Sequence, residues 1–228
     1  MKSLLIVLLL IAAKLFAQEF TVEKVGGDVQ ALIGSNEKWT ELKAGQKLLG
    51  TDLISTGEKS FLQVSDRNNH FVLQENSALR LSSYKKMTLN ELLLALATEE
   101  IRNIPKSNNN PSTRNTAVYG KDAASVKPLP ASIRDLGFKK LNGAKQLAQN
   151  GFKESAIVVA KETFRKYPET KTKVKDHLYF VDLLIQLKLY REAESELIQI
   201  KEQTLNDIEK VSVDARSQKI KSELINKQ

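Results

Sequence analysis

The spacing of apolar residues changes once along the chain. Between residue 18 and about residue 84, apolar positions alternate with polar ones, as at Leu62 and Val64 and again at Phe71 and Leu73. A polar cluster over 66–69 separates these two runs. A period of two places alternate side chains on one face of a strand, so the pattern predicts short antiparallel strands joined by turns.

From Thr88 the spacing becomes helical. Thr88 and Glu91 have the spacing of a capping box, in which each side chain accepts a hydrogen bond at the helix start. Leucines then recur at 89, 92, 93 and 96, and the pattern ends before Pro105. We therefore expect one helix to close a first domain that covers residues 18–104.

A segment over residues 105–130 has neither period. It contains four of the five prolines and three consecutive asparagines, namely Pro105, Pro111, Pro128, Pro130 and Asn108, Asn109 and Asn110. Proline and asparagine favour turns and interrupt regular elements, so this segment is predicted to be a linker.

The remainder, residues 131–228, is predicted to be an all-α domain. Apolar stripes over 141–148, 156–164, 178–185 and 193–200 indicate four helices, and a polar helical tail is expected from about Val213. Breaks are expected at Asn150–Gly151, Tyr167–Pro168 and Lys188–Leu189. The predicted fold class is therefore α+β and multidomain, with an N-terminal β domain and C-terminal helical hairpins.

A short internal repeat supports the hairpins. The segment 151–155 (Gly-Phe-Lys-Glu-Ser) lies 38 positions before 189–193 (Leu-Tyr-Arg-Glu-Ala). An aromatic residue fills the gap at a turn between paired helices, and a small residue allows them to approach. A coincidental pair of amphipathic hairpins is the alternative.

The first 17 residues have the order of a secretory signal peptide. A basic start at Lys2 precedes an apolar run over 4–13, and cleavage is expected between Ala17 and Gln18. The run is shorter than the roughly 20 residues of a spanning helix, so an uncleaved anchor is the weaker alternative. We expect a periplasmic or secreted protein that contacts the membrane only through this signal peptide.

Composition removes most catalytic chemistry. The chain has 228 residues, no cysteine and two histidines, which excludes disulfides and thiol nucleophiles. His70 and His177 have no partner at metal-ligand spacing, and neither a phosphate-binding glycine loop nor a serine-hydrolase motif is present. The sequence therefore predicts a non-enzymatic protein without cofactor or metal.

The remaining candidate side chains have structural and functional interpretations. Trp39 could stack on a sugar or peptide, but packing between sheets is favoured. Phe152 and Tyr190 are expected to fill core positions between helices.

The net charge is +8, and lysines at 139, 140, 171, 173 and 175 could attract an acidic partner, anionic lipid or nucleic acid. A solvated helix face is the default interpretation, and export argues against nucleic acid.

One stretch resembles the FecR domain over about residues 20–84. The resemblance is carried by Val25, Gly27 and Val29, then the run Trp39 to Gly45, then Leu48, Asp52, Ile54, Thr56, Gly57, Ser60 to Val64 and Ser77 to Leu81. It implies a small all-β periplasmic module of the kind found in regulators that sense an outer-membrane receptor. In those regulators an anti-sigma region and a spanning helix precede the module, whereas here it follows a signal peptide directly.

A second stretch, roughly 134–205, resembles tetratricopeptide repeats. Gly143, Phe152, Ser155 and Pro168 in one unit, and Tyr190 and Ala193 in the next, stand at pattern positions, while Asn142 and Val181 depart from it. The resemblance implies stacked helical hairpins that bind extended peptides or partner helices.

These features together predict a non-catalytic adaptor or scaffold of the bacterial cell envelope. Its partners are expected to be envelope proteins, with a cell-wall glycan as the alternative ligand. A regulator of envelope signalling without its own anti-sigma segment is a further alternative. Nucleic acid is not an expected partner.

Overall fold

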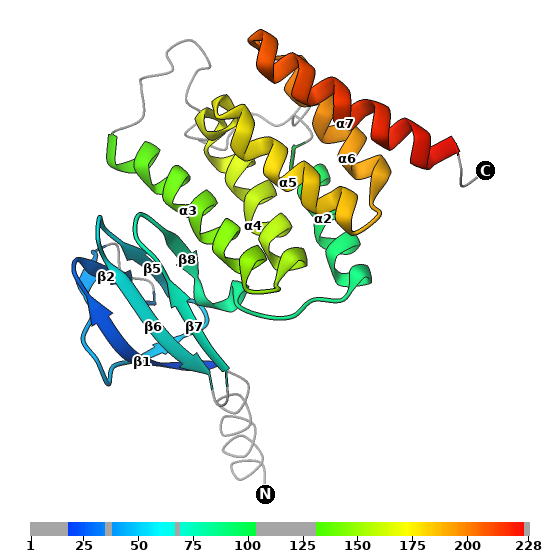
Figure 1. The fold of residues 1–228 in the computed structure, drawn as a ribbon. Helices are drawn as coiled ribbons and strands as arrows, with labels where there is room; N and C mark the ends of the chain where they lie inside the picture. Colours follow the sequence, from blue (N-terminus) through cyan, green and yellow to red (C-terminus); the bar gives the residue numbers. More distant parts are fainter. Residues whose placement is uncertain (1–17, 35–37, 67–68, 104–130, 226–228) are drawn as a thin grey trace, which may run out of the picture.

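A computed structural model describes residues 18–34, 38–66, 69–103 and 131–225 (Figure 1). The predicted signal peptide and the predicted linker lie outside the described residues. The strands are β1 (Glu19–Gly26), β2 (Val29–Leu32), β3 (Thr40–Glu41), β4 (Lys47–Leu49), β5 (Leu53–Thr56), β6 (Phe61–Asp66), β7 (Asn69–Leu73) and β8 (Ala78–Arg80).

These strands form two antiparallel sheets that share one core. The strand orders are β4-β1-β6-β7 and β3-β2-β5-β8. Alternate residues such as Leu62 and Val64 point into the core, where they are fully buried with Phe71 and Leu73. The strands predicted from the period of two are therefore confirmed, and so is the α+β class.

Strands β2 to β5 have too few residues to show a period, and buried polar side chains fix their turns instead. Asp52 is only 1% exposed, and its carboxylate accepts hydrogen bonds from the backbone N–H groups of Gly34 and Leu49, both at 2.8 Å. The Thr56 hydroxyl donates to the Gln74 carbonyl at 2.6 Å and accepts from the Ser77 N–H at 3.1 Å. Buried polar groups that are satisfied in this way hold the turns in one conformation.

The helices follow the predicted stripes closely. They are α2 (Leu89–Asn103), α3 (Ala131–Gln149), α4 (Lys153–Lys166), α5 (Val174–Gln186), α6 (Tyr190–Lys201) and α7 (Asp207–Ile225), with short 3₁₀ turns η1 (Leu81–Ser83) and η2 (Pro168–Thr172). The capping box is confirmed, because Thr88 N–H donates to the Glu91 carboxylate at 2.7 Å and Glu91 N–H to the Thr88 hydroxyl at 3.3 Å.

The last helix begins earlier than predicted. It starts at Asp207 and not near Val213, because Asn206 and Glu209 cap each other: Glu209 N–H donates to the Asn206 side chain and Asn206 N–H to the Glu209 carboxylate, both at 2.9 Å. The helix also contributes Val213 and Ile220 to the core, so it is not a purely polar tail.

Helix α3 lies directly on strand β8 and joins the helices to the sheets. A Cβ atom at Gly143 would lie 2.2 Å from the carbonyl oxygen of Ala78, so only glycine permits this approach. Hydrogen bonds flank the contact: Asn142 donates to the Asn76 carbonyl at 2.8 Å, and Gln146 accepts from the Gln74 N–H at 2.7 Å. One buried apolar cluster consequently extends from the strands through the helices.

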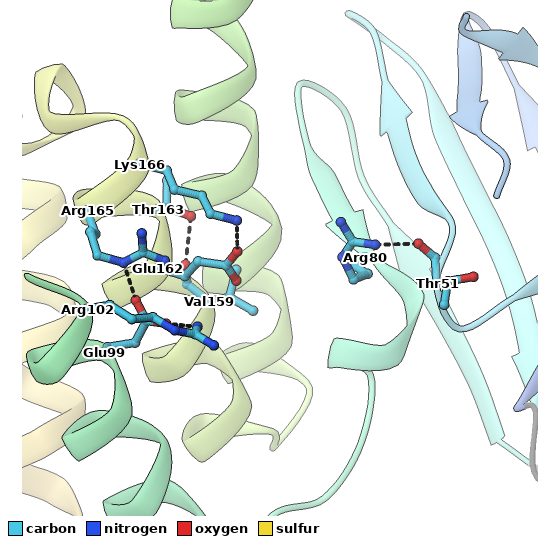
Figure 2. Close-up of polar contacts among 9 residues, drawn as sticks. All are labelled: Thr51, Arg80, Glu99, Arg102, Val159, Glu162, Thr163, Arg165 and Lys166. Atoms are coloured by element: carbon cyan, nitrogen blue, oxygen red, sulfur yellow. Dashed lines mark hydrogen bonds and ion pairs between the residues drawn. The ribbon is translucent and has the colours of Figure 1, made fainter. Parts of the chain in front are cut away.

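Helix α2 packs against α4, on the helical side of the molecule (Figures 1 and 2). Glu99 of α2 is buried between two arginines, accepting from Arg165 Nε at 2.5 Å and from Arg102 Nη1 at 2.7 Å. The helix predicted to close the β domain thus makes its main helical contact with the hairpin α3–α4.

A buried charge network joins α4, α5 and α6. Glu196 pairs with Lys161 and with His177 Nε2, the latter at 2.7 Å. The His177 ring is fully buried against Phe164, with the ring centroids 4.4 Å apart. Burial alone raises the pKa of Glu196, but the His177 hydrogen bond and the Lys161 charge outweigh it and lower the pKa to about 2.

The contact at Gly143 predicts the effect of one methyl group. Gly143→Ala places that methyl against a backbone carbonyl and should lower the free energy of unfolding by about 2 kcal/mol, as overpacking does. Gly50→Ala is the control, because its nearest neighbour lies at 3.5 Å, and it should change stability by less than about 0.5 kcal/mol. Urea unfolding of both variants measures the difference, and equal stabilities would contradict the contact.

The charge network predicts an acid-sensitive contribution to stability. The Glu196 pKa is lowered from 4.5 to about 2, so its stabilisation is complete above pH 4.5 and is lost as the pH falls toward 2. The shift corresponds to about 3 kcal/mol. Glu196→Gln should therefore flatten the pH dependence of unfolding in this window, whereas Glu202→Gln, at an exposed site after α6, should not. Parallel pH profiles for wild type and Glu196→Gln would exclude this contribution.

Candidate functional site

A groove of about 470 Å³ lies between α3, α5 and α7. These helices are the first members of the pairs α3–α4 and α5–α6 and the helix that follows them. The lining residues are Lys145, Lys175, Asp176, Leu178, Tyr179, Asp182, Ile208, Glu209, Ser212 and Arg216.

Ion pairs hold the helices on both sides of the groove. Lys145 of α3 donates to Asp176 of α5 at 2.6 Å. Arg216 of α7 makes a bidentate pair with Asp182 of α5, through Nε at 2.8 Å and Nη2 at 2.7 Å. Bidentate arginine–carboxylate pairs fix orientation as well as distance, so these contacts set the width of the groove.

The groove is apolar between these pairs. Tyr179 and Leu178 contribute ring and aliphatic surface, and Ile208 of α7 is 80% exposed. Burial raises the pKa of the Tyr179 hydroxyl, so the side chain stays neutral at physiological pH. The three lining cations equal the three lining carboxylates, so the groove suits an apolar side chain and gives little net electrostatic attraction.

The lining offers carboxylate, ammonium and hydroxyl groups but no imidazole. Neither histidine lines it, and its hydroxyl groups have no imidazole beside them to act as a base. Among the described residues, no three histidine or carboxylate side chains are grouped to hold a metal ion. The apolar centre of the groove and its ion-paired walls can bind and orient a ligand.

Both histidines lie away from the groove. His70 is exposed and pairs through Nδ1 with Glu23 at 2.9 Å on the surface of the β sheet. His177 belongs to the buried network with Glu196, and its Nδ1 atom has no partner in the part of the chain that the structure describes. Of the predicted cleavage site, Ala17 lies outside the described residues, while Gln18 donates a side-chain hydrogen bond to Asp66 at 2.7 Å.

The prediction that Trp39 packs between the sheets is wrong. Its side chain is 38% exposed and precedes the two-residue strand β3, while Leu42, three positions later, fills the core. The core position next to β3 is thus occupied by Leu42 and not by the indole.

Of the two repeat aromatics, Tyr190 is a core residue, as predicted, and Phe152 packs against the core. Tyr190 is buried and donates its hydroxyl to Glu223 of α7 at 3.0 Å. Phe152 is partly buried and packs on Tyr84 of the β domain, with ring centroids 4.6 Å apart. Phe152, at the turn between α3 and α4, therefore contacts the β domain as well as its own helices.

The singled-out lysines make varied contacts. Lys139 pairs with Asp135 at 3.5 Å, Lys171 donates to Gln199 at 3.1 Å, and the Lys173 ammonium lies 4.3 Å from the Phe138 ring centroid. Lys175 lines the groove. These lysines therefore differ in their partners, and Lys175 is the one of the run over 171–175 that lines the groove.

Of the residues that line the groove, the sequence singled out only Lys175 as a candidate for contact with a partner. Asp182 and Arg216 are separated by 34 positions, and Lys145 and Asp176 by 31, so no local spacing reveals either pair. Arg216 was visible in the sequence as a basic residue on a predicted polar tail, but nothing there indicated its partner.

Among the described helices, none combines the length and apolar character required to cross a bilayer. The chain matches no protein-family model, no curated protein and no solved structure at a significant level. The site must therefore be interpreted from its own geometry.

Proposed function

We propose that this chain is a non-catalytic, exported adaptor of the bacterial cell envelope. In this proposal a FecR-like β module and tetratricopeptide-like hairpins form one body, and the groove between α3, α5 and α7 binds an extended segment of a partner protein. The observation that carries the proposal is this groove, which has an apolar centre and walls held by ion pairs.

The groove favours a peptide over a small charged ligand. Two of its three lining cations are engaged by carboxylates of α5, namely Lys145 by Asp176 and Arg216 by Asp182. The groove can otherwise attract a ligand through apolar contact, and the exposed side chain of Ile208 can make such a contact. Helix-lined grooves that present apolar anchors are a common mode of peptide recognition.

The residues that resemble the FecR pattern have structural roles compatible with a β module. Leu42, Leu48 and Ile54 are buried, and Asp52 and Thr56 satisfy turn backbone groups. None of them lines the groove, so in this proposal the β module supports the helices and offers a second surface.

Site-specific photo-crosslinking tests the groove. A benzoylphenylalanine at Ser212, inside the groove, should capture one defined partner in the native envelope, whereas the same label at exposed Ser195 on α6 should not. Ile208→Glu should reduce that adduct about tenfold or more, the loss expected from one buried aliphatic contact.

The matched control is Ile101→Glu on α2, since Ile101 is 68% and Ile208 80% exposed. The control should leave the Ser212 adduct unchanged. An adduct that survives Ile208→Glu, or that forms equally at Ser195, would rule out peptide binding in the groove.

Glycan binding is the second candidate, and the exposure of Trp39 favours it. An indole at a sheet edge can stack on the face of a sugar ring. If so, the protein co-sediments with purified peptidoglycan, Trp39→Ala abolishes sedimentation and Ile208→Glu has no effect. Sedimentation that is indifferent to Trp39→Ala would remove this candidate.

A further inference from the structure

The outer face of the sheet β4-β1-β6-β7 carries an exposed aromatic ring beside a polar network. Phe61 and Gln63 of β6 point to this face, because Leu62 and Val64 alternate with them and are buried in the core. The helices pack on the side of the sandwich that holds β8 (Figure 1). Phe61 is 40% exposed and the side chain of His70, on β7, is 59% exposed, so this face is open to a ligand.

The Phe61 ring is held against the backbone of β1. Phe61 pairs with Gly26 across the two strands, and a Cβ atom at Gly26 would lie 2.3 Å from Cε1 of the ring. Only glycine leaves room for the ring at this position. An aromatic ring that is fixed in place and still exposed can stack on the apolar face of a sugar ring.

One carboxylate orients two polar side chains beside this ring. Glu23 of β1 accepts hydrogen bonds from Gln63 Nε2 at 2.6 Å and from His70 Nδ1 at 2.9 Å. Hydrogen bonds, first that from Ser65, lower the pKa of the Glu23 carboxyl, so the group is ionised and can only accept. The amide must therefore turn its NH₂ group toward Glu23, and the imidazole must carry a proton on Nδ1.

The atoms that face away from Glu23 are both acceptors. They are the Gln63 Oε1 atom and, in the neutral imidazole, the lone pair of His70 Nε2, and neither has a partner within the described ranges. Both side chains reach the same carboxylate, so the two acceptors lie close together on the sheet. Phe61 is two positions from Gln63 on the same strand, about 7 Å away, so a short oligosaccharide can contact all three side chains.

We propose that this sheet face binds a neutral sugar chain, with Phe61 stacking on one ring and Gln63 and His70 accepting hydrogen bonds from its hydroxyl groups. Glu23 is the positioning residue, which orients both acceptors without contacting the sugar. Hydroxyl groups supply the donors that the two acceptors need, whereas an ionised carboxylate or phosphate supplies none and is repelled by Glu23. Trp39 precedes β3 of the other sheet, so this site is separate from the candidate glycan site at Trp39.

Titration calorimetry with cellohexaose, and with a β-1,4-linked glucuronate hexamer that carries a carboxylate on each ring, tests the site. The protein should bind the neutral chain and not the anionic one. Phe61→Ala should weaken cellohexaose binding about tenfold, as loss of one aromatic contact does, and Phe61→Trp should retain it. Gln63→Leu should weaken binding about fivefold, the loss expected from one hydrogen bond. Gln30→Leu on β2 makes the same change on the other sheet and should have no effect.

Glu23→Gln tests the positioning role. The new amide can donate as well as accept, so it no longer fixes the orientation of Gln63 and His70. Cellohexaose binding should weaken about fivefold, although Glu23 does not touch the sugar. Imidazole ¹⁵N NMR should find the His70 ring proton on Nδ1 in the wild type and not in Glu23→Gln, a change that a merely structural role of Glu23 would not produce.

Three results would overturn the proposal. They are no binding of cellohexaose, equal binding of the glucuronate hexamer, and cellohexaose binding that Trp39→Ala abolishes while Phe61→Ala and Gln63→Leu leave it unchanged. Crosslinking at Ser212 does not involve this sheet face, so failure of the sugar site leaves the peptide groove intact as a proposal.

Discussion

The close contact of α3 with β8 holds this molecule together. A glycine at 143 lets the helix backbone reach the Ala78 carbonyl, and Asn142 and Gln146 satisfy the polar groups beside it. Because the buried cluster is continuous across this contact, the sheets and the helices stabilise one another. The position of α3 along the groove depends on this arrangement.

Buried polar side chains then fix the turns and the helix contacts that apolar packing alone does not determine. Asp52 sets a turn in the sandwich, Glu99 joins α2 to α4, and Glu196 joins three helices. Each carboxylate is engaged by at least two donors, which offsets the cost of its burial.

Much of the architecture follows from local signals in the sequence. The alternation at Leu62 and Val64 gave β6, and the Thr88–Glu91 capping box located α2. Asn206 and Glu209 form an equivalent capping box. The predicted start near Val213 did not take this box into account, so α7 begins earlier than predicted. Trp39 was misplaced because the sequence does not show that Leu42, and not the indole, fills the core beside β3.

The sites could not be predicted in the same way. The groove depends on pairs such as Asp182 with Arg216, which are distant in sequence. Asn142 illustrates the same limit, because a position that departs from the repeat pattern is a docking contact with the β7–β8 turn. Only the tertiary contacts give these residues their roles.

Native-state hydrogen exchange tests most directly whether the sheets and helices form one cooperative body. The amides of Val64 in β6 and Leu147 in α3 are both in buried elements on opposite sides of the α3–β8 contact. Our account predicts that their free energies of opening converge to within about 1 kcal/mol as denaturant is added. Two different limiting free energies of opening, with α3 opening while β6 stays protected, would contradict this account.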